Sequence, residues 1–161
     1  PLEYVEQPCS SVEELRELKA KLLIDIPIAG DEVLRKARDP FTVNLEGAVD
    51  ILMLKVQPLG GIERAHQLAK HHNLPIVVSS ALESAVGINY GLQLAASFEE
   101  LNFDCGLGTG SLLSTNVADL QISDGEIEIK DFEPDFEAHE VAPERYEWWK
   151  NRIMRIGELL A

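Results

Sequence analysis

The chain has 161 residues, of which 45% are apolar, and a formal net charge of −14. This charge argues against nucleic acid or an anionic membrane surface as a partner, because both bind basic surfaces. No apolar run is long enough to span a membrane, no signal segment is visible, and the two cysteines show no metal-ligand spacing. Together these features favour a cytoplasmic protein.

Short apolar runs, each followed by a polar residue or a glycine, recur along the first two thirds of the chain. The residues that end them are Glu6, Asp31, Lys55, Ser80 and Gly106, at intervals of 24 to 26 residues. One strand, one loop and one helix fill such an interval, and strands that alternate with helices form parallel βα units. Functional groups in these folds gather at the carboxyl ends of the strands, so the pattern predicts a cluster of polar groups there.

Helical patterns follow the first two predicted strands. Ser11 and Glu14 form a capping box, and apolar residues then recur with helical spacing as far as Leu22, which predicts a helix on the outside of the sheet. A short helix over residues 33–38 and a weak helical turn around residues 42–48 come next. These elements lead to the third strand.

The third apolar run, residues 51–54, is the strand that delivers Lys55. Its four apolar residues without a polar interruption suit a parallel strand that is covered on both faces. Because side chains alternate along a strand, Lys55 should point to the same side as Ile51 and Met53. The lysine is therefore expected at the rim of an enclosed space.

Two further helices are predicted after Lys55. Gly60 and Gly61 begin the first of them, and Asn73 ends it. The helix after Ser80 is rich in glycine and alanine, which allows another backbone to pack closely against it. A glycine-rich turn at residues 106–110 follows the last and weakest strand, and such turns are only a weak indication of anion binding.

The repeat stops after residue 115. Residues 120–129 read as a β-hairpin, because two alternating runs flank Asp124-Gly125, which supplies the positive φ angles of a type I′ turn. A terminal helix with an apolar stripe is expected from Pro143 onward. Its stripe consists of Trp149, Ile153, Ile156 and Leu160.

The number of repeats limits the fold. A closed (β/α)₈ barrel needs roughly 250 residues, whereas this chain supplies about five βα units. We therefore predict an α/β fold that forms the C-terminal portion of a (β/α)₈ TIM-type barrel, followed by the hairpin and a C-terminal helix. The chain opens within a strand and has no initiator methionine, so we expect that preceding units are missing from it.

Glu6 and Asp31 are the candidate metal ligands. Each follows a run that should be buried, where a carboxylate is costly unless it is paired with or bound to a cation. Two converging carboxylates suit magnesium, which leaves positions for water and substrate oxygens. The alternative is a salt bridge with Lys55 and no metal. With a metal, the three groups could stabilise the negative charge that develops when a proton alpha to a carboxylate is removed.

Four motifs resemble those of the enolase superfamily, whose sites combine a Lys or His base with magnesium. The motifs are YVEQPC at 4–9, AGDE at 29–32, LKVQPLGG at 54–61 and VSSALES at 78–84. Within the superfamily they look most like the o-succinylbenzoate synthase family of menaquinone biosynthesis. The resemblance implies that residues 1–117 are barrel units four to eight. Residues 118–161 would pack on the barrel or on a capping domain that this chain lacks.

The resemblance also implies roles for individual residues. Glu6 and Asp31 look like the second and third ligands of Mg²⁺, with Mn²⁺ as a possible substitute. Lys55 resembles the lysine that stabilises the enediolate in the synthases and acts as a base in related racemases. The substrate-binding candidates, which would contact the succinyl carboxylate, are Ser79, Ser80, Gly106 and Gly108. Glu32 and Gln57 would support the groups that touch the metal and substrate.

The resemblance implies a lyase that dehydrates 2-succinyl-6-hydroxy-2,4-cyclohexadiene-1-carboxylate through an enediolate. This chain lacks the Lys-x-Lys base and the first metal-binding aspartate of the family, so the N-terminal half of the enzyme would be a necessary partner. One alternative is an N-acylamino acid racemase or dipeptide epimerase of the same superfamily. Another is a non-catalytic half-barrel that acts by assembly with a partner chain.

Overall fold

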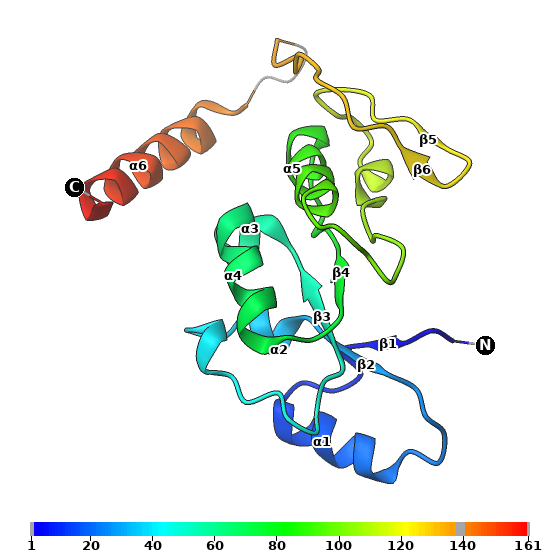
Figure 1. Cartoon of the computed structure of the whole chain (residues 1–161). Coiled ribbons are helices and arrows are strands. Elements are labelled where there is room, and N and C mark those ends of the chain that lie inside the picture. The colour runs from blue at the N-terminus through cyan, green and yellow to red at the C-terminus, as the bar shows by residue number, and fades with distance from the viewer. Residues whose placement is uncertain (1, 138–140, 161) are drawn as a thin grey trace.

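A parallel sheet of four strands forms the centre of the molecule (Figure 1), for which a computed structural model describes residues 2–137 and 141–160. The strands lie in chain order, β1-β2-β3-β4, and each neighbouring pair is parallel. Their bounds are β1 Val5–Glu6, β2 Ile28–Gly30, β3 Ile51–Leu54 and β4 Ile76–Val78. The predicted α/β fold is confirmed as the C-terminal portion of a barrel, since sequential parallel strands joined by helices are its repeating unit.

Helices connect and cover the strands. In chain order they are α1 Val12–Lys21, α2 Glu32–Arg35, the 3₁₀ helix η1 Pro40–Thr42, α3 Val56–Leu59, α4 Ile62–His72, α5 Ala85–Ala96 and the 3₁₀ helix η2 Thr109–Leu112. None of the helices in the described ranges combines the length and the apolar character that a membrane crossing requires.

The two faces of the sheet bury different sets of side chains. The outward face carries residues such as Leu52 and Leu54, which join Leu15 of α1, Leu68 of α4 and Ile88 of α5 in the main hydrophobic core. The inward face holds a second, smaller cluster. Its buried members are Ala29, Ile51, Met53 and Val77. The predicted alternation along β3 is therefore confirmed, with Ile51 and Met53 on the inner side.

The capping box predicted at the start of α1 is present. The Ser11 hydroxyl accepts a hydrogen bond from the Glu14 amide at 3.2 Å, and the Glu14 carboxylate accepts one from the Ser11 amide at 3.0 Å. The helix expected over residues 33–38 is shorter, since α2 has only four residues. The helical turn expected around residues 42–48 is present, because the amides of Ala48 and Val49 donate to the Leu45 carbonyl at 3.0 and 3.1 Å, and the 3₁₀ helix η1 precedes it. Asp39 caps η1 through the amide of Phe41, which explains its position.

Two elements after Lys55 differ from expectation. A single helical turn, α3, begins directly after the lysine and ends at Gly60 and Gly61, whose φ angles of 92° and 122° favour glycine. The fifth predicted strand is reduced to one parallel bridge between Ser79 and Gly106. The apolar run before Gly106 is short and contains a charged residue, so it does not sustain a longer strand pairing.

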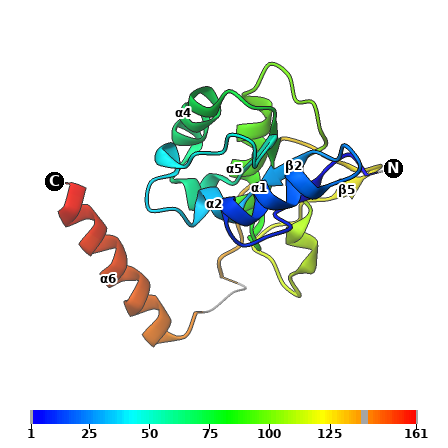
Figure 2. The same cartoon turned by 90° about the horizontal axis from the view of Figure 1, so that it is seen from below.

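The C-terminal elements have the predicted types. The hairpin pairs β5 Ile122–Ser123 with β6 Glu126–Ile127, and both turn residues, Asp124 and Gly125, have positive φ angles of 53° and 84°. The helix α6 Pro143–Leu160 carries an apolar stripe, yet none of its residues is buried. It lies apart from the sheet in both views (Figures 1 and 2). The division at residue 117 and the packing partner of α6 therefore stay predictions.

Candidate active site

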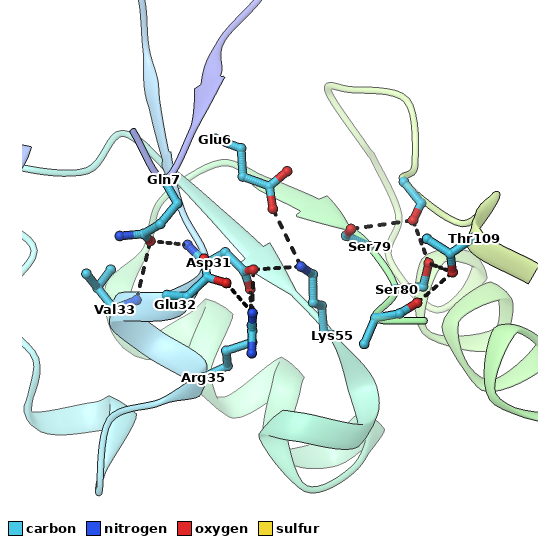
Figure 3. Close-up of polar contacts among 12 residues, drawn as sticks. Glu6, Gln7, Asp31, Glu32, Val33, Arg35, Lys55, Ser79, Ser80 and Thr109 are labelled. Atoms are coloured by element: carbon cyan, nitrogen blue, oxygen red, sulfur yellow. Dashed lines mark hydrogen bonds and ion pairs between the residues drawn. The ribbon is translucent and has the colours of Figure 1, made fainter. Parts of the chain in front are cut away.

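Three charged side chains meet at the carboxyl end of the sheet. The Lys55 ammonium lies 2.7 Å from Asp31 Oδ2 and 3.5 Å from Glu6 Oε1. Figure 3 shows the lysine reaching between the two carboxylates. Asp31 and Lys55 are buried, with 3% and 9% of their side chains exposed, whereas 41% of the Glu6 side chain is exposed. The cluster is thus closed on the Asp31 side and open at Glu6.

The register of the strands explains why these side chains converge. Glu6 lies opposite Ala29, and Ala29 lies opposite Ile51. Because side chains alternate, Asp31 follows Ala29 on the same face by two residues, and Lys55 follows Ile51 by four. All three charged groups therefore lie on the inner face of the sheet, at its carboxyl edge.

Arg35 shares Asp31 with Lys55. Its Nε lies 3.0 Å from each carboxylate oxygen of Asp31, and its terminal nitrogen pairs with Glu32. Burial lowers the pKa of the Arg35 guanidinium, but the hydrogen bonds and charges of Asp31 and Glu32 outweigh this effect and raise it. Arg35 therefore stays charged and neutralises part of the acidic group. Sequence reasoning missed this residue, although Asp31 and Arg35 have the i, i+4 spacing of a helical ion pair.

The carboxylates of Glu6 and Asp31 could supply part of the ligands of a magnesium site. Glu6 and Asp31 offer hard carboxylate oxygens on neighbouring strands, and magnesium typically takes one or two carboxylates together with water or substrate oxygens. Within residues 2–137 and 141–160, no three carboxylate, histidine or cysteine side chains are grouped closely enough to hold a metal by themselves. The ion pair expected without a metal, between Lys55 and a carboxylate, is present. Further ligands would have to come from elsewhere.

The predicted substrate-binding residues form a second polar group beside the first (Figure 3). The hydroxyls of Ser79 and Ser80 donate to the Gly106 carbonyl at 3.4 and 2.8 Å, and Ser80 also bonds the Thr109 hydroxyl at 2.8 Å. Both serines are buried, and Gly108 precedes η2. These bonds join the end of β4 to the following segment. Thr109 was not predicted, because a threonine in a glycine-rich turn gives no sequence signal of its own.

Gln57 lies away from both groups. It is exposed, and its side-chain amide donates to the Gly87 carbonyl at 3.0 Å, which links α3 to α5. Glu83 packs against Gly87: a Cβ on Gly87 would lie 2.9 Å from the Glu83 Cβ, which cannot rotate away, so a larger residue there would force a shift. The Oε1 carboxylate oxygen of Glu83 is buried and has no hydrogen-bond partner among the described residues. Glu83 lies in the motif at 78–84, but its burial could not be predicted from the motif.

The comparisons with known proteins agree with this architecture. Residues 1–134 match the family described as Enolase C-terminal domain-like. The chain belongs to this family. The o-succinylbenzoate synthase of Mycobacterium ulcerans is 46% identical over 164 residues, which cover 99% of this chain and 50% of that protein. This member of the Enolase C-terminal domain-like family thus spans about half the length of the curated relatives it matches.

Solved structures show the same fold. The muconate lactonizing enzyme from Pseudomonas putida superposes with a TM-score of 0.71 at 21% identity, over 85% of this chain and 41% of that one. The L-Ala-D/L-Glu epimerase from Bacillus subtilis superposes with a TM-score of 0.60 at 28% identity, over 76% and 34%. The four-stranded sheet described here therefore corresponds to part of the fold of each of these larger chains.

The environment of Glu83 makes stability depend on pH. Burial raises the pKa of its carboxyl above the ordinary value of 4.5, although a hydrogen bond from the Ala81 backbone and the charge of Lys55 oppose the shift. At pH values well below 4.5 the Glu83 carboxyl is neutral in both the folded and the unfolded chain. As pH rises toward the raised pKa, only the unfolded chain can ionise freely, so folding is increasingly disfavoured.

Glu83→Gln should therefore gain stability relative to the unmodified chain as pH rises from about 4 to 7. Urea unfolding at a series of pH values measures the difference in the free energy of unfolding. Glu100→Gln, at an exposed position, corrects for the loss of one surface charge. If Glu83→Gln and Glu100→Gln change the free energy of unfolding by the same amount at every pH, the expectation is contradicted.

Proposed function

We propose that this chain supplies the C-terminal portion of a magnesium-dependent o-succinylbenzoate synthase, a cytoplasmic hydro-lyase of menaquinone biosynthesis. The substrate would be 2-succinyl-6-hydroxy-2,4-cyclohexadiene-1-carboxylate, which loses one water to give o-succinylbenzoate. The 46% identity to a synthase over 99% of the chain supports this reaction. One observation carries the proposal: Glu6, Asp31 and Lys55 converge in a chain that is this similar to an o-succinylbenzoate synthase.

Glu6 and Asp31 would hold Mg²⁺, with Mn²⁺ as a substitute of the same ligand preference. When bound, the ion supplies positive charge that stabilises an anionic form of the substrate carboxylate. Lys55, whose ammonium lies within 3.5 Å of both carboxylates, supplies a second cation at the same face. Its role is to stabilise the enediolate electrostatically without taking a proton, because an ammonium aimed at developing negative charge lowers the barrier.

The base of the reaction would come from the N-terminal half of the enzyme. It removes the alpha proton, the ring double bond forms as the hydroxyl departs, and the same group returns the proton to that hydroxyl, so that one water leaves in total. Residues 1–117 would complete a barrel with that half. Residues 118–161, including the exposed α6, would pack on the barrel or on the capping domain.

Ser79, Ser80, Gly106 and Gly108 are proposed to face the succinyl carboxylate. The hydroxyls of the two serines already fix the Gly106 carbonyl, which supports a rigid wall at this side of the mouth. Glu32 would act through Arg35, which it shares with Asp31. Gln57 would act through its bond to Gly87, which holds α3, the turn that follows Lys55, against α5.

The proposed dependence on a partner half gives a direct test. The purified 161-residue chain should show no dehydration of the substrate, because it lacks the base and one metal ligand. Addition of the N-terminal half and Mg²⁺ should restore formation of o-succinylbenzoate, followed by its absorbance, and a chelator should abolish it. An active chain without the N-terminal half would contradict the proposal. An assembled complex that binds no magnesium would favour the non-catalytic half-barrel.

A racemase or epimerase is the second candidate, favoured by the 28% identity to the L-Ala-D/L-Glu epimerase. In that case Lys55 would itself exchange the alpha proton of one enantiomer. Lys55→Ala in the assembled enzyme separates the two functions. In a synthase, dehydration should fall by roughly 100-fold or more, the cost of losing one electrostatic group in an active site. Loss of deuterium exchange from one face of an N-acylamino acid, with exchange from the other face retained, would instead indicate a racemase.

A further inference from the structure

Gln7 directly follows Glu6 and has an unusual backbone conformation. Its φ angle is +39°, in the left-handed region that side chains other than glycine rarely adopt. Its backbone amide donates to the Ala29 carbonyl at 2.8 Å, so the residue is held at the end of the β1–β2 pairing. A costly conformation at a fixed position persists only where the surrounding structure imposes it. The contacts of the Gln7 side chain show what this conformation achieves.

The Gln7 side chain reaches across to the start of α2 (Figure 3). Its Oε1 atom accepts hydrogen bonds from the amides of Asp31 at 2.8 Å and Val33 at 3.3 Å. Its Nε2 atom donates to the Cys9 carbonyl at 2.7 Å. Because oxygen faces two donors and nitrogen faces an acceptor, only one orientation of this amide satisfies all three contacts.

Asp31 occupies the N-cap position of α2. An aspartate there commonly accepts hydrogen bonds from the free amides of the first helical turn. The Asp31 side chain makes no such bond, and its carboxylate faces Lys55 and Arg35 instead. The amide of Val33, which Asp31 would otherwise satisfy, is bonded to Gln7.

We propose that Gln7 is a positioning residue: it caps α2 in place of Asp31 and thereby leaves the Asp31 carboxylate free to face the site. The left-handed backbone conformation of Gln7 brings its side-chain amide to the start of α2, while Glu6, the preceding residue, remains on the inner face of the sheet. One residue thus fixes both carboxylates relative to each other. The link to metal binding rests on the function proposed above, but the position of Asp31 does not.

The test replaces Gln7 by methionine, which has a similar length but offers no strong acceptor. In a crystal structure of Gln7→Met, the Asp31 carboxylate should turn to accept from the Val33 amide at about 3 Å and lose its contact with Lys55. An Asp31 that keeps its contacts with Lys55 and Arg35 overturns the proposal. If the methionine variant does not fold, Gln7→Gly applies the same criterion, because glycine accepts the positive φ angle without strain.

Two variants complete the experiment. Gln7→Glu keeps an acceptor at the same reach, so Asp31 should keep its contact with Lys55 in that variant, and its displacement would overturn the proposal. Gln67→Met is the matched control, because Gln67 lies on α4 and its side-chain amide donates to the Glu63 carboxylate at 3.3 Å. It should leave Asp31 unchanged.

A second measurement uses the chain assembled with the N-terminal half. Gln7→Met should raise the Mg²⁺ concentration needed for half-maximal activity by roughly 10- to 100-fold, the usual effect of losing a group that orients a metal ligand. Gln7→Glu and Gln67→Met should not. An unchanged Mg²⁺ requirement in Gln7→Met contradicts the proposal. If the unmodified assembly needs no metal, the proposed function fails, while the crystallographic position of Asp31 still decides the role of Gln7.

Discussion

The ion pair between Lys55 and Asp31 is the interaction on which the carboxyl end of the sheet depends. Both side chains are almost fully buried, and the two charged atoms are 2.7 Å apart. Removing two charges from water costs several kcal/mol per ion, which only good geometry and further hydrogen bonds can offset. Arg35 supplies two such contacts to Asp31, and Glu6 supplies a weaker one to Lys55. Deleting either partner would leave a buried charge poorly compensated.

This arrangement could bind a cation because the two carboxylates differ in burial: Asp31 is enclosed and Glu6 is exposed. Asp31 is held from two sides, whereas Glu6 pairs with Lys55 at 3.5 Å and has 41% of its side chain exposed. A cation could therefore approach from the Glu6 side without first dismantling the buried pair. The second polar group, around Ser80 and Gly106, lies at the end of the neighbouring strand and is internally hydrogen-bonded. A substrate between the two groups would meet charge on one side and fixed backbone on the other.

Strand spacing and alternation were enough to predict the main fold and the convergence of Glu6, Asp31 and Lys55. Both are consequences of local sequence, because a regular interval of βα units brings strand ends together and a two-residue period fixes which side chains face inward. The fifth strand was predicted from its position in the repeat, but its apolar run is short and contains Asp104, and only one bridge to Ser79 forms. The exposed apolar stripe of α6 likewise carries no information about what it packs against.

The supporting residues were harder to predict for a different reason. Gln7 acts on Asp31 across 24 residues of sequence, and Glu83 is buried by a helix whose Gly87 has no side chain to fill the space. Both residues lie within motifs, at 4–9 and 78–84, but one sequence does not show which distant residue each of them contacts. The supporting role of Gln57 stays a prediction, and its contact with the Gly87 carbonyl across 30 residues of sequence is likewise not evident from the sequence. Long-range contacts of this kind are visible only after the chain has folded.

The central claim is that Glu6 and Asp31 form one cation site that faces Lys55. Anomalous scattering from a crystal of the chain assembled with its N-terminal half and grown with Mn²⁺ tests it most directly. The account predicts a single strong peak within about 2.1 Å of a carboxylate oxygen of each residue, the distance expected for a small divalent cation. An ion bound elsewhere, or none at this edge of the sheet while the Lys55–Asp31 pair stays intact, would contradict the account.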